Sequence, residues 1–124
     1  MATAFGDLSA VGLVYANTGV IEQSFATGLV KGYCCPPPGT PTLYGGISAV
    51  DNGTTSMNVY WDTQTTNQPL SAGAGAQLPA SNGLTTAQMS TPSSFDASWD
   101  FSPTGVWVMQ PGPSHPLLRW QLGQ

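Results

Sequence analysis

The sequence contains GLVYANTG at residues 12–19 and, 34 positions later, GISAVDNG at residues 46–53. Each copy opens with a glycine followed by small or apolar residues, and each closes at an Asn-containing turn that ends on glycine. Repetition at a fixed spacing is typical of architectures in which one structural unit stacks on the next. The spacing therefore predicts an imperfect internal repeat of 34 residues.

Each copy leads into a second segment, VIEQSFA at residues 20–26 and SMNVYW at residues 56–61. These segments mix β-branched and aromatic residues with polar ones, and no apolar stripe persists at helical spacing. Short strands that pair with the strand above at about 4.8 Å, separated by Gly and Asn turns, suit a solenoid. We predict an all-β fold of one domain, residues 1–124, in which residues 1–62 form two repeats of a right-handed β-solenoid.

Residues 33–41, YCCPPPGTP, interrupt the two copies. Consecutive prolines remove ladder donors and fix an extended chain, so an insertion at a corner is expected, with a flexible linker as the alternative. Cys34 and Cys35 are adjacent, and their Cα atoms lie about 3.8 Å apart across a trans peptide bond. That spacing is compatible with two thiols or with a strained vicinal disulfide, and it does not identify the redox compartment.

Residues 63–83 are rich in Thr, Gln, Ala and Gly and offer little to bury, which predicts a surface loop. The next residues, LTTAQM at 84–89, carry a capping box in which Thr85 and Gln88 exchange side-chain bonds. Leu84 is placed to pack on Met89 as a hydrophobic staple. One short helix is expected to begin at Thr85 and to end before Pro92.

Residues 84–124 do not repeat and are predicted to form a mixed C-terminal cap. A stack of coils exposes an apolar surface and unpaired strand edges at its end, and terminal units normally cover them. Each aromatic side chain can bury roughly 150–250 Å² in such a cap. The aromatic residues expected there are Phe95, Trp99, Phe101, Trp107 and Trp120.

The composition argues against several partners. Only 6% of the residues are charged, and Lys31 and Arg119 are the only Lys or Arg side chains, so no basic stripe exists for nucleic acid. No apolar run approaches the roughly 20 residues that span a bilayer, and the N-terminal residues lack the basic region of a signal peptide. We expect no nucleic-acid partner and no membrane insertion.

Catalytic residues are not expected. His115 is the only histidine, and it lies between Ser114 and Pro116 with no recognisable nucleophile pattern. Asp96 with Asp100, or Asp62 with either, can be imagined at glycosidase separations of about 5–10 Å. Aspartates in turns, which accept backbone N–H bonds, explain these residues without catalysis.

Metal and cofactor sites are not expected either. Cys34, Cys35 and His115 lack the paired spacing of a zinc site, and residues 51–53 are only a fragment of a calcium loop. Aromatic residues offer a different kind of binding, because flat apolar faces beside hydroxyl and amide groups suit carbohydrate. The candidates are Tyr15, Tyr33, Tyr44, Tyr60 and Trp61, with burial in the core as the alternative for each.

Residues 12–14, 17–19, 21 and 24–28 resemble the GLUG repeats of filamentous-haemagglutinin-like and autotransporter-like bacterial surface proteins. Residues 58–63, 83–89, 94–95, 99–101, 107 and 116–120 look like the sequence that follows the last such repeat. The departures are Tyr15, Val59 inserted before the Tyr-Trp pair, and the Cys-Cys-Pro-Pro-Pro insertion. The resemblance implies a secreted or surface-anchored β-helical segment of an adhesin, without shared catalytic residues.

These observations together predict a non-enzymatic structural or adhesive segment. Its partners are expected to be further copies of the chain, stacked end to end through the N-terminal coil, and a glycan or host-surface ligand. A carbohydrate-binding module is the alternative. A polysaccharide-acting β-helix enzyme is the third hypothesis. The sequence lacks the clustered acid and base that such an enzyme needs.

Overall fold

The computed structural model describes residues 3–6, 9–32, 43–112 and 114–122 of the chain. Within these ranges the chain is mostly β, with two short α-helices, which confirms the predicted all-β class. The sheets are small, with two or three strands each. Tyr33 and the Cys34-Cys35-Pro36 insertion lie outside the described residues.

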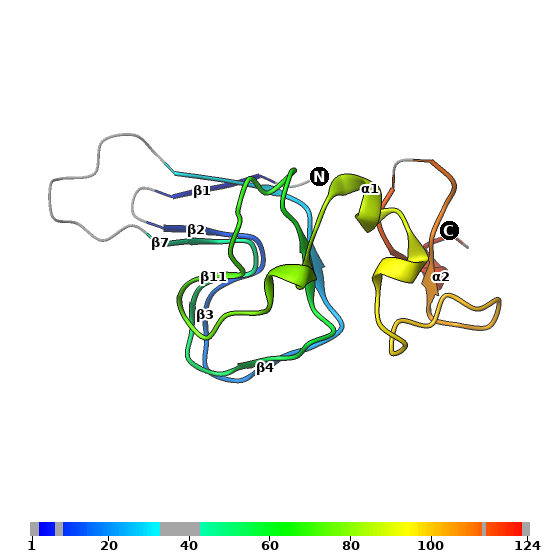
Figure 1. Ribbon diagram of the computed structural model, residues 1–124, viewed down its shortest axis with the longest axis horizontal. Coiled ribbons are helices and arrows are strands. Elements are labelled where there is room, and N and C mark those ends of the chain that lie inside the picture. Colours follow the sequence, from blue (N-terminus) through cyan, green and yellow to red (C-terminus); the bar gives the residue numbers. More distant parts are fainter. Residues whose placement is uncertain (1–2, 7–8, 33–42, 113, 123–124) are drawn as a thin grey trace, which may run out of the picture.

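The chain passes three times through the same region, and most strands of one pass pair with strands of the next (Figure 1). A first strand, β1 (Thr3–Gly6), pairs with the end of the first pass. The first pass holds β2 (Ser9–Val11), β3 (Val14–Asn17), β4 (Val20–Ile21), β5 (Phe25–Ala26) and β6 (Leu29–Gly32). The second holds β7 (Leu43–Gly45), β8 (Ser48–Asp51), β9 (Thr54–Thr55) and β10 (Tyr60–Asp62), and the third holds β11 (Ala72–Gly75) and β12 (Gly83–Leu84).

The two copies of the repeat lie side by side in parallel register. Val14 pairs with Ser48 and Val20 with Thr54, both at the 34-residue spacing seen in the sequence. The spacing becomes 35 where Phe25 pairs with Tyr60, in agreement with one extra residue before the Tyr-Trp pair. The third pass completes two three-stranded parallel sheets, in the orders β11-β8-β3 and β12-β10-β5.

The loop predicted for residues 63–83 is wrong in its central part. This stretch contains β11, a 3-10 turn η1 (Ala80–Asn82) and the start of β12. A strand forms here because Ala and Gly have little side chain to bury and let their backbone pack closely against the neighbouring strand. A Cβ added to Gly73 would lie 2.9 Å from the backbone nitrogen of Tyr44, so β11 packs closely against the second pass because its residues are small.

Trp61 fills the space that the three passes enclose. Its register partners are Ala26 below and Gly83 above, so one large side chain stacks between two small positions. A Cβ added to Gly46 would lie only 2.3 Å from Cδ1 of Trp61, which leaves room there for glycine alone. The indole Nε1–H donates to the carbonyl of Gln68 at 2.8 Å. The other members of this inner core are Ile21, Ala26, Ile47, Val59 and Leu78.

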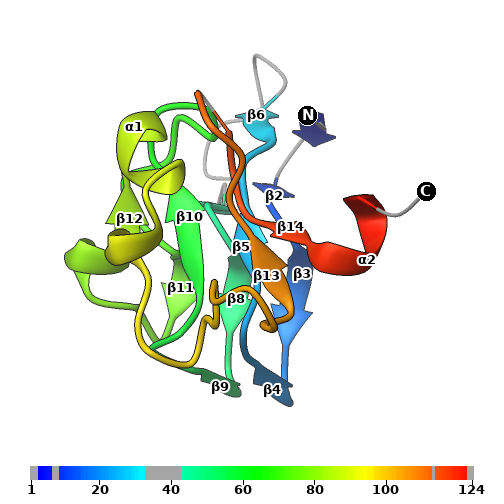
Figure 2. The same ribbon diagram turned by 90° about the vertical axis from the view of Figure 1, so that its right-hand side faces the viewer.

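Tyr60, the neighbour of Trp61 on β10, faces the opposite side of the sheet, as alternation along a strand requires. There it meets the C-terminal segment, residues 85–122, which lies beside the stacked passes in Figures 1 and 2. The elements of this segment are α1 (Thr86–Met89), the 3-10 turn η2 (Pro92–Ser94), β13 (Trp107–Val108), β14 (Leu117–Leu118) and α2 (Arg119–Leu122).

The helix predicted at the start of this segment is confirmed. Thr85 is the N-cap of α1, its hydroxyl accepts from the N–H of Gln88, and the Gln88 side chain accepts from the N–H of Thr85. Leu84 and Met89, the expected staple pair, are both buried in the same cluster. The helix ends before Pro92 as expected.

The position predicted for the cap is wrong. The C-terminal segment packs against the side of the sheet β12-β10-β5, because Phe25 and Tyr60 point outward from two successive passes and supply an apolar lateral face. Residues 76–82 close the end of the stack instead. Leu78 enters the inner core, and Nδ2 of Asn82 donates to the carbonyls of Met57 and Val59, each at 2.8 Å.

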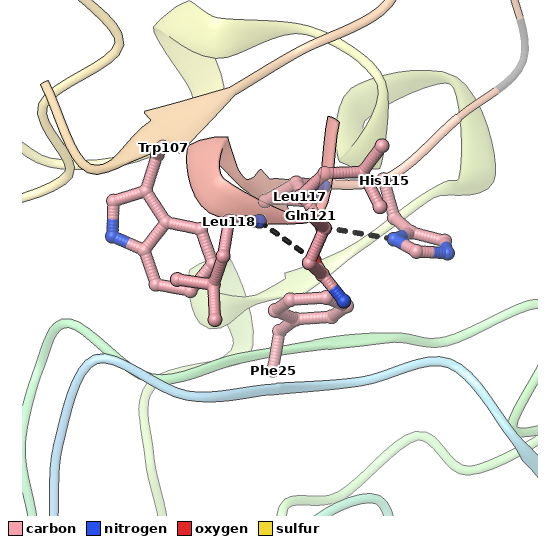
Figure 3. A pocket seen from close by; sticks show the side chains of 7 residues that line it. Phe25, Trp107, His115, Leu117, Leu118 and Gln121 are labelled. Atoms are coloured by element: carbon pink, nitrogen blue, oxygen red, sulfur yellow. Dashed lines mark hydrogen bonds between the residues drawn. The ribbon is translucent and has the colours of Figure 1, made fainter. Parts of the chain in front are cut away.

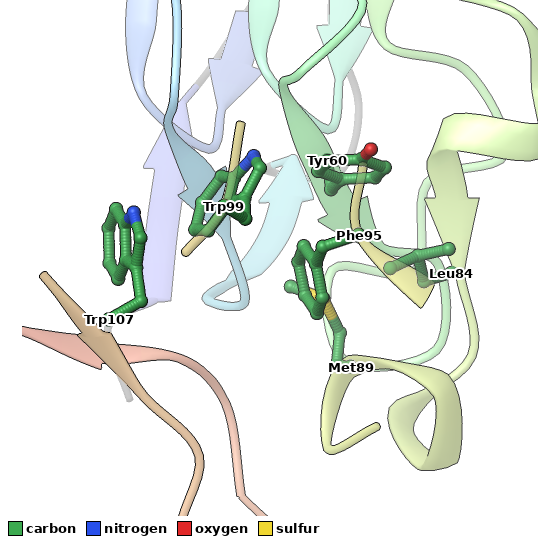
Figure 4. Close-up of a cluster of buried hydrophobic side chains, with 6 residues drawn as sticks. All are labelled: Tyr60, Leu84, Met89, Phe95, Trp99 and Trp107. Carbon is green, nitrogen blue, oxygen red and sulfur yellow. The ribbon is translucent and has the colours of Figure 1, made fainter. Parts of the chain in front are cut away.

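The lateral contact is an aromatic cluster (Figure 4). The rings of Trp99 and Trp107 stack at 4.3 Å between centroids, and Phe95 meets Tyr60 edge-on at 4.9 Å. Such pairs contribute about 0.5–1.5 kcal/mol beyond the area they bury. Trp120, expected among these aromatics, is 61% exposed.

Candidate functional site

A cavity of about 250 Å³ opens where the C-terminal segment meets the first pass (Figure 3). Phe25 of β5 forms its floor, and Trp107 of β13 stands at one side. The ring of His115 lies 5.3 Å from that of Phe25, tilted by 39°. The remaining lining residues are Pro116, Leu117, Leu118 and Gln121.

The walls of the cavity are set by the antiparallel pair β13-β14. Trp107 lies opposite Leu118, and Val108 lies opposite Leu117. Arg119 fastens this pair to the preceding loop, because its Nε–H donates to the carbonyl of Gly105 at 2.6 Å and an Nη2–H donates to that of Ser102 at 2.7 Å. The only arginine of the chain is therefore occupied in holding the backbone beside the cavity.

Two side chains give the cavity its polar character. Nδ1 of His115 lies 2.9 Å from the carbonyl oxygen of Pro116, so in the neutral ring Nδ1 carries the proton and Nε2 is an acceptor. Oε1 of Gln121 accepts from the N–H of Leu118 at 2.9 Å, which orients its amide nitrogen as the group that can donate. An apolar recess with one acceptor and one donor suits a small ring that has an apolar face and hydroxyl groups.

Ser114 and His115 are not joined as a nucleophile and its base. The hydroxyl of Ser114, the residue next to His115, donates to the carbonyl of His115 at 3.1 Å rather than to its ring. A nucleophile has to lie within hydrogen-bond reach of its base, and this one is directed at the backbone.

The carboxylates considered as a glycosidase pair accept hydrogen bonds from residues of their own turns. Oδ1 of Asp62, a buried residue, accepts from the N–H groups of Gln64 and Thr65 at 2.8 and 2.9 Å. Asp96 accepts from both the N–H and the hydroxyl of Ser98. Each of these groups is bound as turn chemistry predicts.

Asp100 is also bound to its own turn. Hydrogen bonds from the side chain and backbone of Ser102, together with the charge of Arg119, hold the pKa of Asp100 below its ordinary value. A lowered pKa keeps the carboxylate ionised, which is the opposite of what a general acid needs.

Asp51, in the segment read as a fragment of a calcium loop, is buried against Asn17 and Thr55. Among the described residues, no group of three or more His, Cys, Asp or Glu side chains is placed to hold a metal ion. Asp51 instead belongs to a stack of turns, in which its carboxylate accepts from the N–H of Gly53.

The aromatic residues expected to face carbohydrate differ in how far the fold buries them. Tyr60 and Trp61 are buried, so neither presents a flat face to a ligand. Tyr15 is exposed on β3 and Tyr44 is half-buried on β7. The cavity around Phe25 was not predicted, since its lining comes from residue 25 and from residues 107–121, and no local pattern joins them.

None of the helices in the part of the chain that the structure describes is long and apolar enough to cross a membrane. No family model, no curated protein and no solved structure matches this chain.

Proposed function

We propose that this chain is a short β-solenoid, and that it acts as a non-enzymatic structural and adhesive segment of a secreted bacterial surface protein. The observation that carries the proposal is that three successive parallel strand pairs between the first and second pass keep one spacing. Ser9 with Leu43, Val14 with Ser48 and Val20 with Thr54 are all 34 residues apart. Strands that repeat at one spacing through several small sheets are what a coil stack requires.

The chemistry of the side chains supports a structural role. Asp51, Asp62 and Asp96 accept hydrogen bonds from their own turns, which leaves them as parts of the scaffold. The surface is poor in charge and rich in hydroxyl and amide groups, which suits contact with glycans or with a host surface. The resemblance to GLUG repeats adds the location, at the bacterial surface or outside the cell.

Two measurements test this proposal. Beads coated with the chain are expected to be retained on layers of host cells or on mucin, whereas beads coated with heat-unfolded chain are not. The chain is also expected to leave a panel of polysaccharides unchanged after long incubation. Equal retention of the two kinds of bead would contradict the adhesive role, and release of new reducing ends would contradict the non-enzymatic one.

A carbohydrate-binding module is the second candidate, and the cavity of about 250 Å³ favours it. Trp120 is exposed on α2, directly before Gln121 in the cavity wall, and can extend an aromatic surface from the recess. A glycan array would be probed with the chain and with the Trp120→Ala variant. Signals lost in Trp120→Ala but kept in Val106→Ala, an equally exposed control, support this function, and an array without signals overturns it.

A further inference from the structure

The two ends of the stacked passes are unlike each other. On the first pass Leu13 is 41% exposed and Tyr15 is 60% exposed. Their counterparts on the second pass, at the register set by Val14 and Ser48, are Ile47 at 1% and Ala49 at 0%. The first pass therefore presents an apolar surface at positions that become buried once a further layer covers them.

In the part of the chain that the structure describes, the backbone of β3 also has no neighbouring strand on its outer side. Among the described strands, β3 lies at the edge of the sheet β11-β8-β3. On its inner side, toward β8, the N–H of Val14 donates to the carbonyl of Ile47 at 3.2 Å. Alternate residues of a parallel strand bond to opposite neighbours, so the N–H and C=O of Tyr15 point away from β8. An edge of this kind is a template for another strand.

The opposite edge of the same sheet is blocked by a side chain. Oε1 of Gln77 accepts from the N–H of Ala72 at 3.2 Å, and Nε2 of Gln77 donates to the carbonyl of Ala72 at 2.5 Å. The amide of Gln77 thus takes the place of a fourth strand on β11. Leu78 and η1 then close the space beneath.

We propose that the outer side of β3, with the exposed Leu13 and Tyr15, is the docking surface for a second copy of this chain, joined β3 to β3 about a two-fold axis. This inference rests on the proposed structural function and names its partner. Head-to-tail growth would pair β3 of one copy with β11 of the next, and Gln77 blocks that edge of β11. A two-fold contact pairs β3 with β3, so the dimer has no open β3 edge left for a third copy. The exposed residues between 13 and 20 carry no charge, so like faces meet without repulsion.

A two-fold axis across this end places β3 antiparallel to the β3 of the partner copy. The geometry continues the existing contact, because β3 already pairs on its other side with β8. The assembly is therefore a closed dimer and not a filament that grows by adding copies.

The mass of the chain in solution tests the dimer. Light scattering over a concentration series is expected to approach twice 12.8 kDa and to rise no further. Tyr15→Lys, on the docking surface, is expected to weaken dimerisation at least tenfold. Val106→Lys, at a site of similar exposure in the C-terminal segment, is the control and should leave it unchanged. A monomer at every concentration, an unlimited rise in mass, or equal effects of both variants would overturn the inference.

A second measurement tests the two-fold contact. Ala16→Cys, made in a chain that also carries Cys34→Ser and Cys35→Ser, places one thiol on exposed β3. A short thiol-specific crosslinker is expected to join two copies through this site, but not through Val106→Cys in the same background. Absence of the Ala16→Cys product overturns the proposal. The polysaccharide and bead assays are independent of this result, so failure of the dimer leaves the proposed function to its own tests.

Discussion

Nδ2 of Asn17 donates to Oδ1 of Asp51 at 3.0 Å, although the two residues are 34 positions apart. Both are buried, and each lies at the same place in its own copy of the repeat. Oδ1 of each side chain also accepts from the N–H two residues later, that of Gly19 or of Gly53. One turn therefore repeats in successive passes, and its polar side chains bind each other between the passes.

Replacing Asn17 by alanine removes the amide that this contact needs. Oδ1 of Asp51 and the carbonyl of Thr54 both lose the Nδ2 donor. The free energy of unfolding is expected to fall by about 2–3 kcal/mol, since bonds to charged groups contribute about 1.5–3 kcal/mol. Urea unfolding of Asn17→Ala measures the loss. Asn52→Ala, an exposed change in the adjoining turn, should stay within about 0.5 kcal/mol, and equal losses would refute this role for Asn17.

Gly46 lies directly against the indole of Trp61 in the inner core. In Gly46→Ala the added methyl would lie 2.3 Å from Cδ1 and 2.6 Å from Cγ of Trp61, and that indole is held by its bond to Gln68. Overpacking of this kind typically costs about 1–3 kcal/mol. Gly19→Ala is the matched control, because its added methyl meets nothing closer than 4.0 Å. Equal unfolding midpoints for the two variants would show that the core yields at Trp61.

The sequence predicts the repeat because both copies obey the same turn chemistry at one spacing. It also predicts α1, whose capping box is local and reads directly from Thr85 and Gln88. It does not predict β11, since a strand made of Ala and Gly is held by backbone packing and leaves no apolar alternation.

Local sequence patterns do not predict where the C-terminal segment packs, for a different reason. Tyr60 and Trp61 are adjacent aromatics on opposite faces of β10, and nothing in their types says which of them faces inward. The cavity has the same cause, because Phe25 becomes part of it only when the C-terminal segment packs on the side of the sheet.

Tyr60 gives the fold a sensitivity to alkaline pH. Burial raises the pKa of Tyr60, and the charge of Asp96 acts in the same direction, while the bond from the N–H of Asp96 partly opposes them. The unfolded chain loses the phenol proton near its ordinary pKa of about 10, before the folded chain does. Stability is therefore complete below pH of about 10 and declines as the pH rises through the folded pKa.

Unfolding followed from neutral to alkaline pH tests this dependence with Tyr60→Phe as the comparison. The variant loses the oxygen that accepts from the N–H of Asp96 and should be less stable by about 1 kcal/mol at neutral pH. Its stability should decline less steeply above pH of about 10. Parallel profiles for the two proteins would mean that the alkaline decline originates elsewhere.

Arg119 is expected to be needed for the loop beside the cavity. Its guanidinium donates to the carbonyls of Gly105 and Ser102 in a fork that a lysine ammonium cannot reproduce. Arg119→Lys should raise amide hydrogen exchange across residues 102–107 and lower stability by about 1.5–3 kcal/mol. Trp120→Ala changes the exposed neighbour and should leave the exchange of that loop unaltered. Unchanged exchange in Arg119→Lys would mean that the loop is ordered by the aromatic cluster alone.

Gln77 is predicted to limit the size of the assembly. In Gln77→Ala the N–H and C=O of Ala72 lose the amide that binds them, so β11 becomes an open edge. A chain with open edges at both ends can extend as well as dimerise, and light scattering should then report a mass that keeps rising with concentration. Gln110→Ala, an exposed change in the C-terminal segment, should keep the dimer mass. If Gln77→Ala keeps it too while remaining folded, then Leu78 and η1 are sufficient to close that end and the Gln77 side chain is not the barrier.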